Sequence, residues 1–399
     1  RARRQQPRPS SNGRAAAPVR AADVVTPPLG LYVHIPFCSA ICHYCNFNRG
    51  LMDAALKDAY VEALVTHVAR LAEPILVDTI YMGGGTPSLL DPHDVRRIVE
   101  ACRAAFDVVP GTEITMEANP ETVDARRLAG FRAAGVTRLS FGVQSFRDEE
   151  LRRLGRLHSA DRARAAMREA RAEGFDDVSL DLMMWLPGQS VSQWMMSVDA
   201  LIDMAPDHAS LYLLELYPNA PLQELMAREQ WSQTAEDDAA DMYELAMGRL
   251  AAAGLAQYEI SNVARQGHES RHNLKYWHDT GWLAVGCGAH GSREGRRWSH
   301  VADTGAYVDR VMAGADPTGQ SRHLDRTQQL AEALFMGLRL VEGIDLAAFR
   351  ARFDVDVWDR YGDALAPASE AGLLERVSGR IRLTRRGMLL ANEVMQVFV

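Results

Sequence analysis

The sequence predicts an α/β protein built on a partial, open (β/α)6 barrel, followed by a mixed C-terminal helical, winged-helix-like domain. The first observation is a unit that recurs from residue 31 to about residue 217. Each unit has a short apolar run rich in β-branched residues, a polar or glycine-containing loop and a segment with helical periodicity. Strands that alternate with helices pair in parallel, because parallel neighbours need a crossover connection. The second observation is that the unit occurs six times, fewer than a closed barrel of this type contains.

The elements of the predicted barrel follow one another at short intervals. We expect strands at residues 31–36, 79–83, 113–118, 138–143, 177–183 and 209–215. The helical segments between them include residues 54–72, 92–105, 123–134, 160–173 and 191–204. In such a barrel the functional groups lie after the C-terminal ends of the strands, so residues at these positions are the first candidates for a site.

Three closely spaced cysteines, Cys38, Cys42 and Cys45, follow the first strand, and their spacing lets a short loop direct the sulfurs to one point. A structural zinc ion is one explanation, but such sites use four protein ligands, and no fourth Cys or His stands nearby at finger-like spacing. A disulfide between Cys38 and Cys42 is another, although five cysteines in 399 residues are few for a disulfide-stapled secreted protein. An iron-sulfur cluster fits better, because three cysteine ligands leave one iron of a four-iron cluster free for a substrate or cofactor.

The later strand ends also carry unusual residues. The second strand ends in a triple glycine, residues 83–85, which would let backbone groups approach a ligand closely. The third ends at Glu117, and the fourth and fifth bring Gln144, Arg156 and Asp181. Each of these residues alone is more often structural than functional. Their shared position after successive strands favours one binding site.

Composition and charge limit the classes of function. The 47% hydrophobic and 24% charged residues are ordinary for a soluble, enzyme-like protein of two or three domains. No apolar run approaches the roughly 20 residues that span a membrane. Free cysteines and the lack of a secretory apolar segment predict a reducing, cytoplasmic location.

Residues 1–28 are expected to form a disordered basic tail. Residues 1–22 hold six arginines and no acidic residue, and three prolines interrupt any helix. An organellar transit peptide has a similar composition, but the prolines and the lack of apolar periodicity favour a plain flexible tail. Without residues 1–22 the chain carries 38 basic and 52 acidic residues, so we expect no general binding of nucleic acid.

The cysteine pattern and its flanks resemble a known superfamily. Cys-x-x-x-Cys-x-x-Cys after residues 32–37, Tyr-Val-His-Ile-Pro-Phe, is similar to the motif of radical S-adenosylmethionine proteins, specifically the coproporphyrinogen dehydrogenase and HemW group. The resemblance covers residues 31–399, with every motif present in order. It implies a radical-SAM barrel and a [4Fe-4S] cluster held by the three cysteines. It also implies that S-adenosylmethionine is bound by Tyr32, Gly84, Gly85, Thr86, Glu117, Gln144, Arg156 and Asp181.

One departure separates two groups of this superfamily. Oxygen-independent coproporphyrinogen dehydrogenases carry a further cysteine where this chain has Phe47. The segment from Cys45 to Asn48 instead resembles the HemW heme chaperones, with Asn46 in place of their usual Asp. The resemblance therefore favours the chaperone group.

A second motif supports the same group. The segment from His272 to Trp277 resembles the His-Asn-x-x-Tyr-Trp motif of the HemW chaperones. The resemblance implies a heme site in which His272 ligates the iron while Tyr276 and Trp277 cover the macrocycle. The residues alone favour a hydrogen-bonded core histidine with ordinary core aromatics. His290 and His268 are alternative iron ligands.

These resemblances imply a heme chaperone that binds heme, a [4Fe-4S] cluster and S-adenosylmethionine, and delivers heme to acceptor proteins, membrane-bound respiratory enzymes among them. No nucleic-acid partner is expected, and a homodimer remains open. The alternative is an oxygen-independent coproporphyrinogen III dehydrogenase or another radical enzyme such as a methyltransferase. Whether the protein is an enzyme is therefore left open.

The predicted organisation places the barrel at residues 29–260, a connecting segment with the His-Asn-x-x-Tyr-Trp motif at 261–324 and a C-terminal domain at 325–399. In the C-terminal domain we expect helices at residues 327–339, 346–353 and 358–371, a hairpin around 377–383 and a last helix from 385. This order resembles a winged helix, but its mixed charges favour a packing or lid role over DNA reading.

Overall fold

The computed structural model describes residues 27–218 and 220–398, so most of the expected basic tail lies outside the described residues. Its main sheet has twelve strands, and six of them are parallel neighbours in chain order. These six are β1 (Leu29–Ile35), β4 (Leu76–Gly84), β5 (Asp107–Ala118), β6 (Arg138–Gln144), β7 (Asp177–Met184) and β8 (His208–Leu213). They confirm the predicted run of parallel strands.

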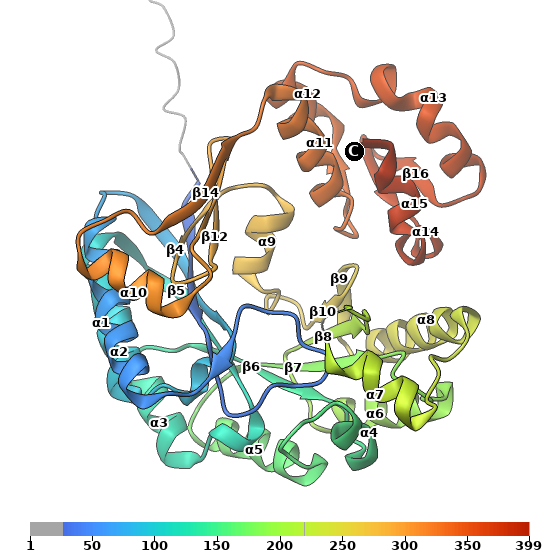
Figure 1. Cartoon of the computed structure of the whole chain (residues 1–399). Coiled ribbons are helices and arrows are strands. Elements are labelled where there is room, and N and C mark those ends of the chain that lie inside the picture. Colours follow the sequence, from blue (N-terminus) through green and yellow to red (C-terminus); the bar gives the residue numbers. More distant parts are fainter. Residues whose placement is uncertain (1–26, 219, 399) are drawn as a thin grey trace, which may run out of the picture.

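Helices connect these strands and cover the outer side of the curved sheet (Figure 1). They are α1 (Ala54–Arg70), α2 (Pro92–Ala105), α3 (Ala125–Ala133), α4 (Asp148–Arg153), α5 (Ala160–Ala172) and α6 (Val191–Asp203), with short η1 (Pro87–Leu89) and η2 (Pro120–Thr122). Side-chain caps start several of them, because the first N–H groups of a helix lack partners within it. Asp53 accepts from Leu56 N in α1, and Ser190 with Gln193 forms a capping box in α6.

The sheet extends beyond the six predicted strands at both ends. Beside β8 lie β10 (Asn262–Ala264) and β9 (Ala256–Glu259), and beside β1 lie β11 (Trp282–Val285), β12 (His290–Arg293), β13 (Arg296–His300) and β14 (Thr318–His323). Strand β11 is parallel to β1, whereas β12, β13, β14, β10 and β9 join antiparallel. Region 261–324, expected as a connecting segment, thus supplies strands to the main sheet. In the described chain β9 and β14 end the strand order, so the sheet is open as predicted.

The core lies between the sheet and its helices. Leu31, Val33 and Ile35 of β1 are fully buried, as expected for a parallel strand covered by helices. Helices α7 (Pro221–Glu229), α8 (Glu236–Ala252), α9 (Arg271–Trp277) and α10 (Thr304–Met312) complete this part of the chain. The structure shows no helix among the described residues that is long and apolar enough to cross a membrane.

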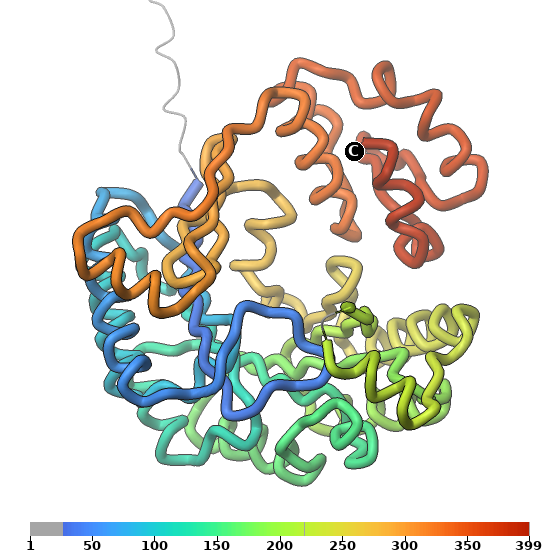
Figure 2. The backbone as a smooth tube through the Cα atoms, viewed as in Figure 1, coloured from blue at the N-terminus to red at the C-terminus, as the bar shows by residue number. Residues whose placement is uncertain are grey.

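The C-terminal residues form a separate apolar core around Leu334, Phe349 and Val394. The helices are α11 (Arg326–Gly337), α12 (Leu346–Phe353), α13 (Val357–Glu370), α14 (Arg385–Leu389) and α15 (Ala391–Met395), with η3 (Gln396–Phe398). A small sheet of β15 (Ile344–Asp345), β17 (Arg380–Leu383) and β16 (Leu374–Val377) includes the expected hairpin. Figure 2 shows this part of the chain on the side where α9 and β9 lie. There the chain after α11 is fastened by two backbone bonds, from Ile260 N to Arg339 O at 3.1 Å and from Val341 N to Tyr258 O at 3.0 Å.

Candidate functional site

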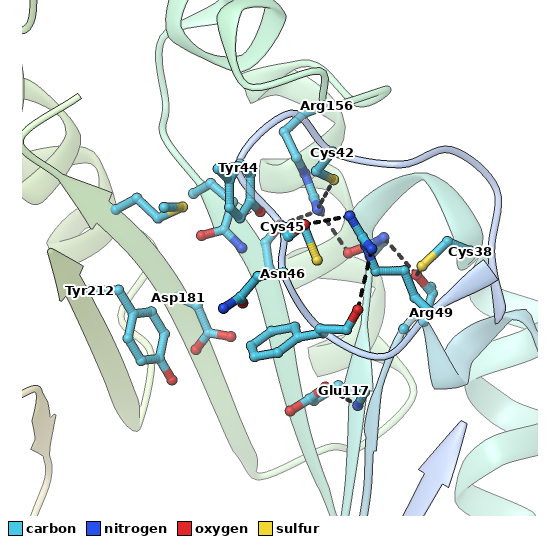
Figure 3. A pocket seen from close by; sticks show the side chains of 18 of the residues that line it. Cys38, Cys42, Tyr44, Cys45, Asn46, Arg49, Glu117, Arg156, Asp181 and Tyr212 are labelled. Carbon is cyan, nitrogen blue, oxygen red and sulfur yellow. Dashed lines mark hydrogen bonds between the residues drawn. The ribbon is translucent and has the colours of Figure 1, made fainter. Parts of the chain in front are cut away.

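The C-terminal ends of the parallel strands surround a cavity of about 340 Å³. The structure brings together at its walls all three cysteines and most of the residues expected at the site (Figure 3). Lining residues that the sequence pointed to are Cys38, Cys42, Cys45, Gly84, Gly85, Thr86, Glu117, Gln144, Arg156 and Asp181. Tyr32 does not line the cavity. Its side chain lies deeper, where its hydroxyl is 3.0 Å from His34 Nδ1.

The cysteine loop is closed at its base and anchored along its length. Short strands β2 (Phe37–Cys38) and β3 (Gly50–Leu51) pair in parallel, and Met52 N donates to Cys38 O at 3.0 Å. In the middle of the loop, His43 N donates to Leu154 O at 3.0 Å, which ties it to the end of α4. The three cysteines are not in disulfides, and Cys38 is buried while Cys42 and Cys45 are partly exposed.

Donors and cations surround the three sulfurs. Arg156 Nη1 lies 3.4 Å from Cys42 Sγ, and Thr86 Oγ1 lies 3.7 Å from Cys38 Sγ. Burial raises the pKa of the Cys38 thiol to about 11, while Thr86 and Arg49 act to lower it. A cluster needs thiolates, so binding iron must displace these protons. The donor set, three cysteines beside two guanidinium groups, fits an anionic iron-sulfur cluster.

The triple glycine has a structural reason that differs from the expected one. Gly84 has φ of 117°, in a region that favours glycine, and a Cβ there would lie 2.4 Å from the His34 ring. At Gly85 a Cβ would lie 2.7 Å from Phe37 O. Both glycines therefore let the end of β4 pack against the chain that leads into the cysteine loop. Close packing against β1 thus explains these two glycines as well as the close approach of a ligand would explain them.

Two partly buried carboxylates form one wall of the cavity. Glu117 accepts from the Tyr81 hydroxyl at 2.8 Å and from Gly84 N at 3.0 Å. Burial raises its pKa to about 7, with Asp181 raising it further and the two hydrogen bonds lowering it. Burial also raises the pKa of Asp181, although Ser140 Oγ donates to it at 3.1 Å. Glu117 thus gives the wall a charge that depends on pH near neutrality.

Several polar atoms at the cavity have no partner within the described chain. Arg49 Nε, Arg156 Nε and Gln144 Oε1 are buried in this way. Gln144 also has φ of 68°, an uncommon value for a residue with a side chain and one that costs energy. Orphaned polar atoms and local strain at one cavity are what a polar ligand would satisfy. The residues therefore fit S-adenosylmethionine, which carries carboxylate, amino and hydroxyl groups.

The second predicted site, around the His-Asn-x-x-Tyr-Trp motif, lies away from the cavity on α9. His272 is fully buried, and its two ring nitrogens lie 2.9 Å from Thr79 Oγ1 and 2.8 Å from the Tyr276 hydroxyl. Burial lowers the pKa of His272 to about 3, so the ring is neutral at physiological pH. In this arrangement neither nitrogen is free to bind iron. The structure therefore supports the alternative of a hydrogen-bonded core histidine. Of the other histidines considered, His290 is exposed on β12 and His268 is about one-third exposed.

Sequence reasoning did not single out several residues of the cavity wall. Arg49, from the end of the cysteine loop, and Tyr212 and Leu213, at the end of β8, all line it. Their place in the fold could have indicated the last two, because both lie at the C-terminal end of a parallel strand. The sequence also did not show that Asn119 links Thr86 to Arg156. Its amide donates to Thr86 Oγ1 at 3.1 Å, and its Oδ1 accepts from Arg156 at 2.7 Å.

Comparison with known families gives two matches. Residues 32–201 match the model of the Radical SAM superfamily, and residues 324–390 match that of the HemN C-terminal domain. The Heme chaperone HemW of Bacillus subtilis is 34% identical over 373 residues, which cover 92% of this chain and 98% of that protein. The protein of the same name from Mycobacterium tuberculosis H37Rv is 38% identical over 384 residues, with 93% and 95% covered.

Two further comparisons extend this picture. Radical S-adenosyl methionine domain-containing protein 1, mitochondrial, of Bos taurus is 37% identical over 385 residues, with 92% of this chain and 86% of that protein covered. Among solved structures, coproporphyrinogen III oxidase (HemN) from Escherichia coli superposes with a TM-score of 0.83 at 24% identity, and covers 93% of this chain and 90% of that one. At this identity the superposition shows the shared fold.

Proposed function

Because this chain belongs to the heme chaperone HemW family of the radical SAM superfamily, we propose that it binds heme, a [4Fe-4S] cluster and S-adenosylmethionine and passes the heme to acceptor proteins. The observation that carries the proposal is the composition of the cavity. Cys38, Cys42 and Cys45 share its wall with Glu117 and Arg156. The cluster ligands and the residues expected to hold S-adenosylmethionine thus face the same space.

The residues of the chain have distinct tasks in this proposal. The three cysteines hold the cluster, which, when bound, supplies an electron and an open iron to S-adenosylmethionine. Arg156, with a free Nε, is the cation for the carboxylate of S-adenosylmethionine. Gln144 and Asp181 offer acceptors for ribose hydroxyls, and Thr86 and Asn119 keep Arg156 in place.

Phe47 favours a chaperone over a porphyrinogen dehydrogenase. It stands where the dehydrogenases that this chain resembles carry a further cysteine, and it lines the cavity with 63% of its surface exposed. An apolar ring at this position offers contact to a flat, apolar ligand and no sulfur to a metal. Heme is such a ligand. We therefore place the heme-transfer function ahead of oxidative decarboxylation.

Three histidines are candidate ligands of the heme iron. Binding of iron by His272, with Tyr276 and Trp277 over the macrocycle, would need the bonds to Thr79 and Tyr276 to break. His290 is exposed and needs no such change, whereas His268 would have to leave Asp177, 3.7 Å from its Nδ1. We propose a cytoplasmic protein whose partners are heme and heme-accepting proteins, membrane-bound respiratory enzymes among them. We propose no nucleic-acid partner, and a homodimer stays open to test.

One incubation tests the proposed function. Anaerobically reconstituted protein is given heme, coproporphyrinogen III and S-adenosylmethionine together, and the products are analysed. We expect bound heme and no net conversion of porphyrinogen. Protoporphyrinogen would instead show a dehydrogenase, and a methylated product would show a methyltransferase. Cys42→Ser should lose the iron and the cluster spectrum, and stoichiometric zinc in wild-type protein would favour a structural metal.

A further inference from the structure

Helix α9 carries the His-Asn-x-x-Tyr-Trp motif and is fixed to the sheet by a buried carboxylate. The N–H groups of Arg271 and His272 donate to Glu113 of β5 at 2.9 and 3.1 Å. Ser270 caps the same end by accepting from Asn273 N. Because Glu113 is itself buried, these bonds set where the helix begins relative to β5. His272 is thereby held at the sheet.

The His272 ring is held on both of its nitrogens and on one face. Thr79 and Tyr276 lie at hydrogen-bond distance from the two nitrogens. The Tyr81 ring stacks on it, with ring centres 5.2 Å apart and an angle of 27° between the planes. Gly30 leaves room for it, since a Cβ there would lie 3.0 Å from the His272 ring. The ring is therefore a fixed support for Tyr81.

Tyr81 connects this support to the cavity. Its hydroxyl donates to Glu117 Oε1 at 2.8 Å, and Gly84 N donates to the other oxygen of the same carboxylate at 3.0 Å. Tyr32 also stacks on Tyr81, with ring centres 6.2 Å apart. Glu117 has thus two donors within the described chain, and only Tyr81 is a side chain whose position other side chains set.

We propose that His272 is a positioning residue for the cavity, acting through Tyr81 on Glu117, rather than a ligand of heme iron. The inference rests on the assignment of the cavity to S-adenosylmethionine. Loss of the His272 ring would leave a space beside Tyr81, into which that ring can tilt. The hydrogen bond from Tyr81 to Glu117 would then be distorted. The Glu117 carboxylate at the S-adenosylmethionine site would no longer be held in one position. The motif thereby links the face of the sheet near α9 to the pocket.

The test compares S-adenosylmethionine affinity, heme titration and thermal stability on holoprotein with its cluster reconstituted anaerobically. His272→Ala and Tyr81→Phe should each weaken S-adenosylmethionine binding by about tenfold, as expected for loss of one charge-assisted hydrogen bond. Both should also reduce the change that S-adenosylmethionine causes in the EPR spectrum of the reduced cluster. Heme titration should stay unchanged. His278→Ala is the matched control, because His278 lies just past the same helix and is 44% exposed.

A double-mutant cycle decides whether His272 acts through Tyr81. The combined His272→Ala and Tyr81→Phe protein should bind S-adenosylmethionine no more weakly than about the worse single variant. Additive losses would overturn the proposed route. Unchanged affinity in folded His272→Ala, or loss of the heme band with unchanged affinity, would overturn the positioning role.

Two further variants keep the result interpretable. If His272→Ala does not fold, His272→Gln takes its place, since Gln can still bond to Thr79 or Tyr276 but cannot stack on Tyr81. Glu117→Gln reports on the pocket itself. A normal affinity in Glu117→Gln would show that the pocket assignment is wrong, and the inference with it. Weak binding in Glu117→Gln with normal binding in the His272 variant would overturn the inference alone.

Discussion

The guanidinium of Arg339 lies over the Trp277 ring, 4.3 Å from its centre, and joins the C-terminal domain to α9. The same group donates to Glu259 Oε2 at 3.0 Å, and Glu259 is fully buried. Glu259 also accepts from Ser261 N at 2.9 Å. A buried carboxylate whose cation is removed keeps its desolvation cost without the compensating charge.

Arg339→Leu should therefore lower the free energy of unfolding by about 2 to 3 kcal/mol, somewhat below the range for fully buried pairs because the Arg339 side chain is 24% exposed. Urea unfolding measures this change. Arg350→Ala is the control, because the Arg350 side chain is 66% exposed and its pair with Asp356 should contribute under about 1 kcal/mol. Equal losses of unfolding free energy in the two variants would contradict a stabilising role for the contacts of Arg339. Limited proteolysis of Arg339→Leu should also release the C-terminal domain first.

Arg156 should contribute directly to the affinity for S-adenosylmethionine. Its guanidinium already bonds to Asn119 and Gly142 O, and its Nε is left without a partner in the described chain. Arg156→Ala should weaken binding by about 1.5 to 3 kcal/mol, the range for a hydrogen bond to a charged group. Equilibrium dialysis on reconstituted protein measures this change. Arg152→Ala, an exposed residue of α4, should bind normally, and equal affinity in all three proteins would show that the pocket is misplaced.

Glu117 should make the stability of the protein depend on pH in a known direction. Its pKa rises from 4.5 to about 7 on burial, so the folded state binds more protons than the unfolded state between these values. Stability from this group is therefore full below about pH 4.5 and is lost as pH rises to about 7. The loss amounts to about 3 kcal/mol at most.

Unfolding in urea at a series of pH values checks this prediction. Wild type should lose stability across the window, and Glu117→Gln should lose correspondingly less. Other titrating groups act on both proteins, so the difference between the two curves isolates Glu117. Parallel curves would mean that Glu117 is ionised in the folded state at all these pH values.

The parallel strands were predictable from the apolar face that each strand turns toward the helices. Leu31, Val33 and Ile35 alternate along β1, share one face and are fully buried. Strand β14 was not predictable, since its residues are mostly exposed and polar and it is defined by its pairing with β13. An edge strand of this kind has no apolar periodicity to read. The main sheet therefore has more strands than the six that the sequence predicted.

Some residues of the site were likewise predictable from the sequence, and others were not. Residues at strand ends, such as Glu117, follow from topology, because all C-terminal ends of parallel strands meet at one edge. Tyr32 lies three residues before the end of β1, or roughly 10 Å, and so supports the wall from below instead of lining it. The role of His272 depends on Thr79 and Tyr81, which lie on β4 almost 200 residues earlier. Local sequence cannot show such a contact.

Arg49 should set the reduction potential of the cluster. Figure 3 shows it between Cys38 and Cys45, and its guanidinium donates to Cys45 O and to Phe47 O. Reduction adds negative charge to the cluster, and a nearby cation stabilises that charge. Arg49→Leu should therefore shift the midpoint potential to more negative values, by tens of millivolts.

A redox titration followed by EPR measures the midpoint potential of the cluster in Arg49→Leu. Arg49→Lys is the matched variant, because it keeps the charge while losing the planar pair of bonds to the two carbonyl oxygens. Its potential should stay near that of wild type if charge is the cause. A shift of equal size in both variants would instead assign the effect to the hydrogen bonds that hold the loop at Cys45. An unchanged potential in Arg49→Leu would show that the guanidinium turns away from the cluster once iron is bound.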